Sequence, residues 1–183
     1  MTTKPVIVFD LDHTLVHSDP VRRHGFDTAL LHIGKERLFV HLRPGAPDLI
    51  RYLCRQKKMR FGFWTAGTME YAQAVVEVLF RAAHVSNWRS QICTLLSRKS
   101  AVPLKDGTFL KQLTVVSKSL EVPPSCVWLV DDDLVHTTAP CNRGRILQAP
   151  AFVARSTTRR DAFLPYLQGS LKHLCHRSIH ASF

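Results

Sequence analysis

The sequence of 183 residues lacks the features that mark secreted or membrane proteins. Its five cysteines are odd in number and form no Cys-x-x-Cys pair, so we expect free thiols in a reducing compartment. No apolar run approaches the ~20 residues that a membrane-spanning helix needs. The first residues, Met-Thr-Thr-Lys-Pro, have neither the length nor the flanks of a signal peptide. We therefore expect an intracellular protein, nuclear or cytoplasmic, that does not bind membranes.

Acidic residues are scarce, with 14 against 25 basic ones, and the formal net charge is +11. Such a charge attracts polyanions, including phosphoproteins and nucleic acids. The basic residues are scattered along the chain and form neither a basic tail nor a basic amphipathic helix. This distribution is typical of a solvated surface that favours anionic substrates. Binding to nucleic acid is possible on this basis but not favoured.

Repeats, low-complexity tracts and linkers are also absent, which predicts a single domain over residues 1–183 with a core at about 5–175, and a monomer. Short apolar runs alternate with segments of helical spacing, so we expect an α/β fold with a parallel sheet and helices on both faces. The expected strands are 6–9, 61–64, 127–130 and 146–149. Helices are expected from about 47, after Thr68, over 109–120 and from about 161, with a hairpin over 26–42 that turns at Gly34 and short strands around a turn at 106–107.

The first expected strand ends in two carboxylates, Asp10 and Asp12. Ligands of open parallel sheets bind beyond the carboxyl ends of the strands, and this spacing lets both side chains reach that crevice. A divalent cation would relieve their repulsion, and Mg²⁺ suits a site with a few carboxylates and substrate phosphate oxygens. An acidic turn in solvent is the alternative, because Asp-x-Asp alone is a common motif.

Two other expected strands also end in polar residues. Three consecutive acids, Asp131, Asp132 and Asp133, follow the third strand, and their mutual repulsion calls for a cation or a basic partner. A helix N-terminus is a compatible alternative, and Asp133 is the acid that a capping role alone would explain. Thr65 follows the second strand and could donate its hydroxyl to a phosphate oxygen near the start of the next helix, or belong to an ordinary cap region.

The motif over residues 10–18, Asp-Leu-Asp-His-Thr-Leu-Val-His-Ser, resembles the signature of the haloacid dehalogenase superfamily. More narrowly, it resembles the phosphatases that act on the C-terminal domain of RNA polymerase II and their small-phosphatase relatives, the NLI-interacting-factor-like family. Further similar segments follow in order at 42–45, 63–67, 71–72, 109–113 and 127–132. The resemblance implies a Rossmann-like domain with small hairpin insertions and no large cap domain. It also implies hydrolysis of phosphoserine or phosphothreonine.

The same resemblance assigns roles to individual residues. Asp10 is expected to be the nucleophile that forms an aspartyl phosphate. Asp12 would protonate the leaving oxygen and then activate water, while Thr14 supports the loop. Thr65 would contact the phosphoryl oxygens and Lys111 would balance their charge, because a carboxylate attacking a phosphate ester brings two anions together.

The implied Mg²⁺ site consists of Asp10, the backbone carbonyl of Asp12, Asp131 and Asp132. Three assignments remain open at the level of sequence. Lys105 and Lys118 are rivals of Lys111, since only the Leu-Lys-Gln-Leu context selects it. Arg43 precedes a Pro-Gly turn and could form either a structural salt bridge or a functional contact. His17 could assist substrate contacts or make a structural hydrogen bond.

The spacing between Thr14, Thr65 and Lys111 leaves room for hairpins but not for a lid domain, which predicts an open site for a phosphorylated protein segment such as a polymerase tail. One alternative is a nucleic-acid end phosphatase, motivated by the charge of +11. Another is a catalytically inactive scaffold that binds phosphoproteins. All the acids that turnover requires are present, which argues against the scaffold.

Overall fold

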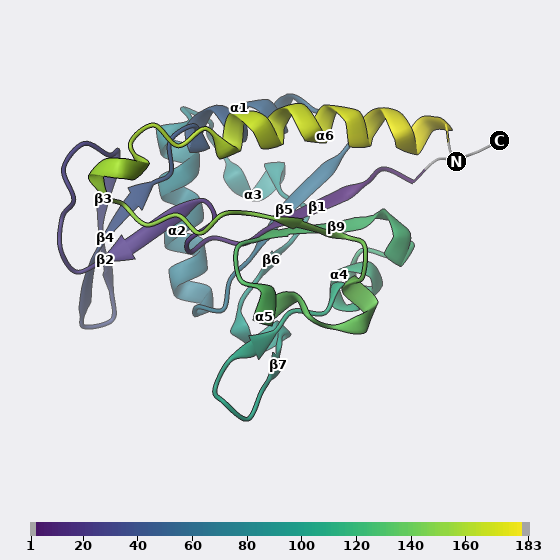
Figure 1. Cartoon of the computed structure of the whole chain (residues 1–183), viewed down its shortest axis with the longest axis horizontal. Coiled ribbons are helices and arrows are strands. Elements are labelled where there is room, and N and C mark those ends of the chain that lie inside the picture. The colour runs from purple at the N-terminus through teal and green to yellow at the C-terminus, as the bar shows by residue number, and fades with distance from the viewer. Residues whose placement is uncertain (1–2, 181–183) are drawn as a thin grey trace.

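A computed structural model describes the backbone of residues 3–180 and the side chains as far as residue 173. Its centre is a five-stranded sheet in the order β10-β9-β1-β5-β6, in which all neighbours run parallel (Figure 1). The strands are β1 (Val6–Phe9), β5 (Arg60–Trp64), β6 (Leu95–Leu96), β9 (Val127–Asp131) and β10 (Ile146–Gln148). The four strands expected from the sequence are confirmed. Every residue of β1 is fully buried, as its uninterrupted apolar run predicts for a strand covered on both faces.

Helices cover both faces of this sheet, because alternate side chains of a strand point to opposite sides. Ile7 and Phe9 of β1 belong to the core under α1 (Ala46–Arg55), α2 (Met69–Ala82) and α6 (Phe163–His180). Val6 and Val8 belong to a second core under α4 (Leu113–Ser119). In Figure 1, α1 and α6 lie together above the sheet and α4 lies below it. The prediction of an α/β fold with helices on both faces is confirmed.

Helix starts follow the capping signals in the sequence. The Thr68 hydroxyl accepts a hydrogen bond from the Tyr71 backbone N–H at 3.2 Å, and α2 begins at the next residue. The Asp161 carboxylate accepts from the Phe163 N–H at 2.9 Å, where α6 begins. Leu164, Leu167 and Leu171 of α6 are buried as expected, while the Leu174 side chain, also predicted to face inward, lies outside the described side chains.

A three-stranded antiparallel sheet is attached to the core, in the order β2-β4-β3. Its strands are β2 (Val16–Asp19), β3 (Thr28–Ile33) and β4 (Glu36–Leu42). The expected hairpin is β3–β4, and Gly34 occupies its turn with a positive φ of 58° that favours glycine. Strand β2 was not predicted, because three of the four residues in Val-His-Ser-Asp are polar and the segment forms a strand only through pairing with β4.

The helix predicted over 109–120 is wrong in its first part. Residues Phe109–Leu110 form β8, which pairs with β7 (Val102–Pro103) around the expected turn at 106–107. Apolar residues at 109, 110, 113 and 116 imitate helical spacing, but α4 begins only at Leu113. The backbone between β8 and α4 is therefore not helical, and Lys111 lies in that connection.

The remaining short elements connect these parts. They are the helices α3 (Trp88–Gln91) and α5 (Leu134–Thr137) and the 3₁₀ segments Arg98–Ser100, Pro124–Cys126, Pro140–Asn142 and Ser156–Thr158. Insertions within residues 3–180 are thus small sheets and single turns, and no large cap domain is among them, as expected. No helix in that range has the length and apolarity to cross a bilayer.

Candidate active site

The predicted site residues meet at the carboxyl ends of three adjacent strands. In the sheet, Phe9 is in register with Val130 on one side and with Phe63 on the other. The next residue after β1, Asp10, donates its backbone N–H to the Val130 carbonyl at 2.8 Å and so lies beside Asp131. Parallel pairing in this register brings the acidic strand ends together.

Lys111 joins two of these acids from below the sheet edge. Its side chain is fully buried, and its Nζ donates to Asp10 Oδ1 at 2.5 Å and to Asp131 Oδ2 at 2.7 Å. The lysine backbone is held as well, because the Asn142 amide donates to the Lys111 carbonyl at 2.6 Å. The rivals Lys105 and Lys118 are exposed, on the β7–β8 turn and on α4. The structure therefore brings Lys111, and neither rival, to the acids.

The charges in this cluster are unbalanced toward negative. Burial alone lowers the pKa of Lys111, but the carboxylates of Asp10 and Asp131 outweigh it and hold that pKa above its ordinary value. Burial raises the pKa of Asp10 well above its usual range, opposed by Lys111 and reinforced by Asp131 and Asp12. Burial also raises the pKa of Asp132. The three raised pKa values are those expected where a single ammonium lies among several carboxylates that are wholly or partly buried.

The donor set fits a divalent cation. Carboxylate oxygens of Asp10, Asp131 and Asp132 lie within 4.8 Å of one another. Oxygen ligands of this kind are those that Mg²⁺ accepts in proteins, with water and phosphate oxygens completing its shell. Lys111 is the only ammonium that pairs with these acids among the described residues, so the cluster keeps an excess of negative charge that a cation would offset. The part assigned to the backbone carbonyl of Asp12 stays a prediction.

Asp12 is not part of the three-carboxylate group, and its carboxylate lies against two hydroxyls. Thr65 Oγ1 donates to Asp12 Oδ2 at 3.2 Å, and the Tyr71 hydroxyl donates to Asp12 Oδ1. The Ser18 and Tyr71 hydroxyls lie 2.5 Å apart, and the Tyr71 donation to Asp12 leaves Ser18 as the donor in that pair. Burial first, and then the nearby Asp12 carboxylate, raises the pKa of Tyr71, so the phenol stays protonated. Both carboxylate oxygens of Asp12 are thereby fixed in orientation.

Tyr71 is a site residue that the sequence reasoning missed. Its position in the apolar stripe of α2 explains its burial but not its hydroxyl contact. One signal was available, since Tyr71 lies in the first turn of the helix that follows Thr65. Close packing there depends on Gly67, because a Cβ at that position would lie 2.8 Å from the Tyr71 ring and 3.2 Å from Thr65 Oγ1.

Thr14 and Asp133 have supporting contacts. Thr14 Oγ1 donates to Asp132 Oδ1 at 3.0 Å and so ties the loop after β1 to the acids after β9. Asp133 accepts from the Val135 N–H at 2.7 Å and caps α5, which is the capping alternative left open by the sequence. Its carboxylate is not part of the three-carboxylate group.

Arg43 makes structural contacts and does not touch the acids of the site. Its fully buried guanidinium donates to the two carboxylate oxygens of Asp161 at 3.1 and 2.8 Å, and to the backbone carbonyls of Thr14 and Pro150 at 3.0 and 2.9 Å. These contacts connect the loop after β1 to the start of α6. Of the two alternatives for Arg43, the contacts favour the structural salt bridge.

His17 does not make the structural hydrogen bond that was one of its alternatives. Its Nδ1 is buried and has no hydrogen-bond partner among the described atoms. The ring lies against His13 and His41, with centroid distances of 5.4 and 6.0 Å. Burial lowers the pKa of His17 below its ordinary value.

The parallel sheet with helices on both faces is the Rossmann-like fold implied by the resemblance to the haloacid dehalogenase superfamily. Within it, the sequence matches the NLI interacting factor-like phosphatases over residues 5–178, and the chain belongs to this family. Among curated proteins, none matches the sequence at a significant level.

Two solved structures share the fold. A fission yeast Fcp1 variant, an RNA polymerase II CTD phosphatase bound to beryllium fluoride, is 15% identical with a TM-score of 0.56, and the match covers 94% of this chain and 51% of that one. A second structure of Fcp1, described as an essential RNA polymerase II CTD phosphatase, is 14% identical with the same TM-score and coverage. At this identity the likeness shows the fold alone. The chain spans about half the length of these proteins.

Proposed function

We propose that this protein is a Mg²⁺-dependent phosphatase that acts through an aspartyl-phosphate intermediate on phosphoserine or phosphothreonine in a protein segment. The observation that carries the proposal is the buried Lys111, whose Nζ lies 2.5 Å from Asp10 and 2.7 Å from Asp131. Burying an ammonium between two carboxylates is costly, and a structural core would be as stable with apolar residues in their place. A site that must neutralise a phosphoryl group provides a reason for the arrangement.

Asp10 is the proposed nucleophile. Its Oδ1 accepts from Lys111, and within the described part of the chain no hydrogen bond reaches Oδ2. In the first step an oxygen of Asp10 forms a bond to phosphorus, and the bond from phosphorus to the alcohol oxygen breaks. Asp12, oriented by Thr65 and Tyr71, gives its proton to that leaving oxygen.

The second step restores the enzyme. Asp12 takes a proton from a water molecule, the water oxygen forms a bond to phosphorus, and the bond between Asp10 and phosphorus breaks to release phosphate. Lys111 stays protonated throughout and offsets charge on the phosphoryl oxygens. A Mg²⁺ ion held by Asp10, Asp131 and Asp132 would neutralise part of the negative charge shared by the carboxylates and the phosphoryl group.

Three observations support a protein substrate. The chain belongs to a family of phosphatases, and its fold is that of Fcp1, which is described as acting on the polymerase C-terminal domain. No large cap covers the site within residues 3–180, so an extended segment has access to it. The net charge of +11 attracts phosphorylated segments. We also propose that the chain acts as a single domain and a monomer.

The test is phosphate release from an aryl phosphate and from phosphoserine peptides, with and without Mg²⁺. Asp10→Asn is expected to lose essentially all turnover, because an amide cannot form the acyl phosphate. Asp133→Asn is the matched control, since the contacts of this carboxylate lie within the short helix α5 that it caps, and it is expected to retain most activity. Wild-type protein that hydrolyses none of these substrates with Mg²⁺ would contradict the proposal in favour of a phosphoprotein-binding scaffold.

The nucleic-acid alternative has its own arm in the same assay. Terminally phosphorylated oligonucleotides are compared with phosphopeptides at equal concentration and ionic strength. Faster release from the oligonucleotides would decide for an end phosphatase. Small sugar phosphates complete the panel, because an open site is expected to prefer the peptides over them.

A further inference from the structure

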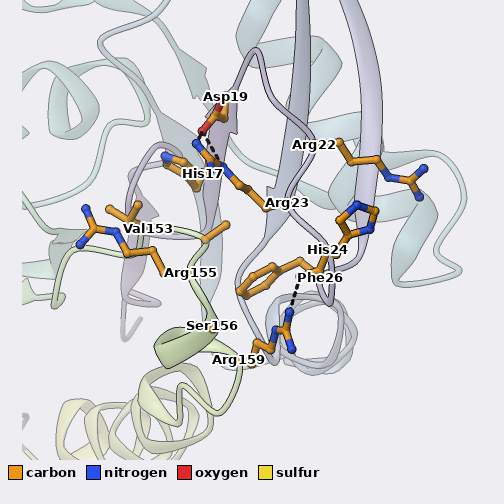
Figure 2. A pocket seen from close by; sticks show the side chains of 11 residues that line it. His17, Asp19, Arg22, Arg23, His24, Phe26, Val153, Arg155, Ser156 and Arg159 are labelled. Carbon is orange, nitrogen blue, oxygen red and sulfur yellow. Dashed lines mark hydrogen bonds and ion pairs between the residues drawn. The ribbon is translucent and has the colours of Figure 1, made fainter.

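A second concave surface lies against strand β2 and is lined by residues of β2 and of the segment that follows it (Figure 2). It encloses about 580 Å³ between the segment around β2 and residues 153–159. Four of its lining residues are arginines, at positions 22, 23, 155 and 159, and two are histidines, His17 and His24. We call this surface the basic pocket.

The basic pocket carries an excess of positive charge. Asp19 is the only carboxylate that lines it, and Arg23 pairs with Asp19 at 2.6 Å. The hydrogen bonds from Arg23 and from the Val21 N–H hold the pKa of Asp19 below its usual range, so this pair is fully ionised at neutral pH. Within the described residues, no salt bridge neutralises the three other arginines of the pocket. Like charges gathered at one concave surface favour an anionic ligand.

One arginine at the pocket is fixed in position by contacts with the backbone, and two others are exposed at its edges. Arg159 Nη2 donates to the His24 carbonyl at 3.0 Å, and its guanidinium lies so close to Gly25 that a Cβ there would be 2.5 Å from Nε. Arg155 and Arg22 lie at opposite sides of the pocket in Figure 2, and both are exposed. Phe26 supplies an apolar surface between them, backed by the Phe152 ring at 5.8 Å. Apolar walls with a few charged groups are typical of ligand sites.

Strand β2 separates this pocket from the candidate active site. Because side chains alternate along a strand, Ser18 points to Tyr71 and through it to Asp12, whereas His17 and Asp19 line the pocket. His17 is also in ring contact with His13, which directly follows Asp12. Its buried Nδ1 has no partner, so the pocket wall contains an unmet polar atom. The pocket and the active site are therefore built on the two faces of one short strand.

We propose that the basic pocket binds a second phosphate group on the same peptide whose phosphoserine or phosphothreonine enters the active site. This inference rests on the proposed function. A phosphate dianion offers three acceptor oxygens, and arginine is the side chain best shaped to donate to them. The pocket is a single hollow rather than a continuous basic track, which nucleic acid would need along its backbone. A multiply phosphorylated peptide fits this arrangement better.

The test uses the double variant Arg22→Gln with Arg155→Gln, since both side chains are exposed and their loss should leave folding intact. Arg160→Gln with Lys35→Gln is the matched control, because it removes the same two charges from exposed residues that do not line the pocket. Each protein is assayed with an aryl phosphate, with singly phosphorylated peptides, and with doubly phosphorylated peptides whose phosphoserines are about two to five residues apart. A further peptide carries glutamate in place of the second phosphoserine.

Wild type and the control are expected to prefer the best doubly phosphorylated peptide over the singly phosphorylated one by roughly tenfold in kcat/KM, mainly through KM. The glutamate peptide should lie between them. The double variant should lose most of this preference while its aryl phosphate turnover stays unchanged. Two results would contradict the phosphate-binding role of the pocket while leaving the proposed function intact. In the first, wild type turns over aryl phosphate but does not prefer the doubly phosphorylated peptides. In the second, the double variant keeps that preference.

If the wild-type protein hydrolyses none of these substrates, a binding measurement tests the pocket instead. Fluorescence anisotropy of a labelled doubly phosphorylated peptide then compares wild type, the control and the double variant. Weaker binding in the double variant alone supports the pocket, and equal binding in all three overturns it. A single-stranded oligonucleotide that binds more tightly than the peptide, and loses affinity in the double variant, overturns the proposal in favour of nucleic acid.

Discussion

Two charged regions lie on either side of strand β2, and they differ in how their charges are held. At the candidate active site, the ammonium of Lys111 and the carboxylates around it are buried and bound to one another. In the basic pocket most of the arginines are exposed, and three lack a carboxylate partner among the described residues. The first arrangement fixes the positions of reacting groups, whereas the second leaves charge available for a ligand. Substitutions should therefore affect catalysis and stability in the first region, and substrate choice in the second.

The largest effect is expected at Lys111. Lys111→Met removes the only ammonium among the site's described acids and leaves the buried carboxylates of Asp10 and Asp131 without a cationic partner. Turnover should fall by about 10³-fold or more, since a charge that stabilises the phosphoryl group is lost. Removing one partner of a buried pair also costs about 3–5 kcal/mol of unfolding free energy. Steady-state kinetics and urea denaturation measure the two effects.

Lys118→Met provides the control for this substitution, because Lys118 is exposed on α4. It should change the unfolding free energy by less than about 0.5 kcal/mol and leave turnover unaffected. Equal losses in the two variants would show that the contacts of Lys111 with the acids do not determine either property.

Arg43 is expected to have the next largest effect, on stability rather than on catalysis. Arg43→Gln breaks the pair between the fully buried arginine and the partly buried Asp161, together with two hydrogen bonds to backbone carbonyls, and should cost about 3 kcal/mol. The exposed Arg160→Gln should cost less than about 0.5 kcal/mol. Thermal denaturation of both variants measures this difference between buried and exposed arginines. Similar Tm values in the two variants would show that burial of Arg43 does not determine its contribution to stability.

A substitution at Tyr71 tests whether its hydroxyl orients Asp12 in the active site. Tyr71→Phe keeps the buried ring but removes the donor to Asp12, and should lower kcat by about tenfold with little change in Tm. A variant with unchanged kcat would show that the hydroxyl has no part in orienting Asp12.

The features that could be predicted from the sequence are those that depend on the local pattern of residues. Uninterrupted apolar runs predicted the strands of the parallel sheet, and the acids that follow β1 and β9 predicted where charge gathers. Lys111 could be selected over Lys105 and Lys118 only by a resemblance, because the same apolar spacing suggested a helix at 109–120. Its side chain enters the site because β8 pairs with β7 and the backbone leaves helical geometry there.

The parts that the sequence did not predict depend on contacts between distant segments. Strand β2 exists through its pairing with β4, and it places Ser18 and Tyr71 together although they are 53 residues apart. The basic pocket combines arginines from two segments more than a hundred residues apart, which look like scattered surface charges in the sequence. Tertiary pairing, rather than local propensity, creates both features.

The smallest effect is expected from the histidines between the two regions. Burial is the main cause that lowers the pKa of both His17 and His41 below about 6.5, so the folded protein binds protons there less readily than the unfolded chain. Stability should therefore be full above that pH and should decline as the pH falls through it toward the folded-state pKa values. The drop in Tm from about pH 7.5 to about pH 5.5 should be smaller in His41→Gln than in wild type, whatever the substitution does to Tm at the higher pH. His32→Gln, on strand β3, controls for the general effect of acid. An equal drop in Tm in all three proteins would show that these histidines do not cause the dependence of stability on pH.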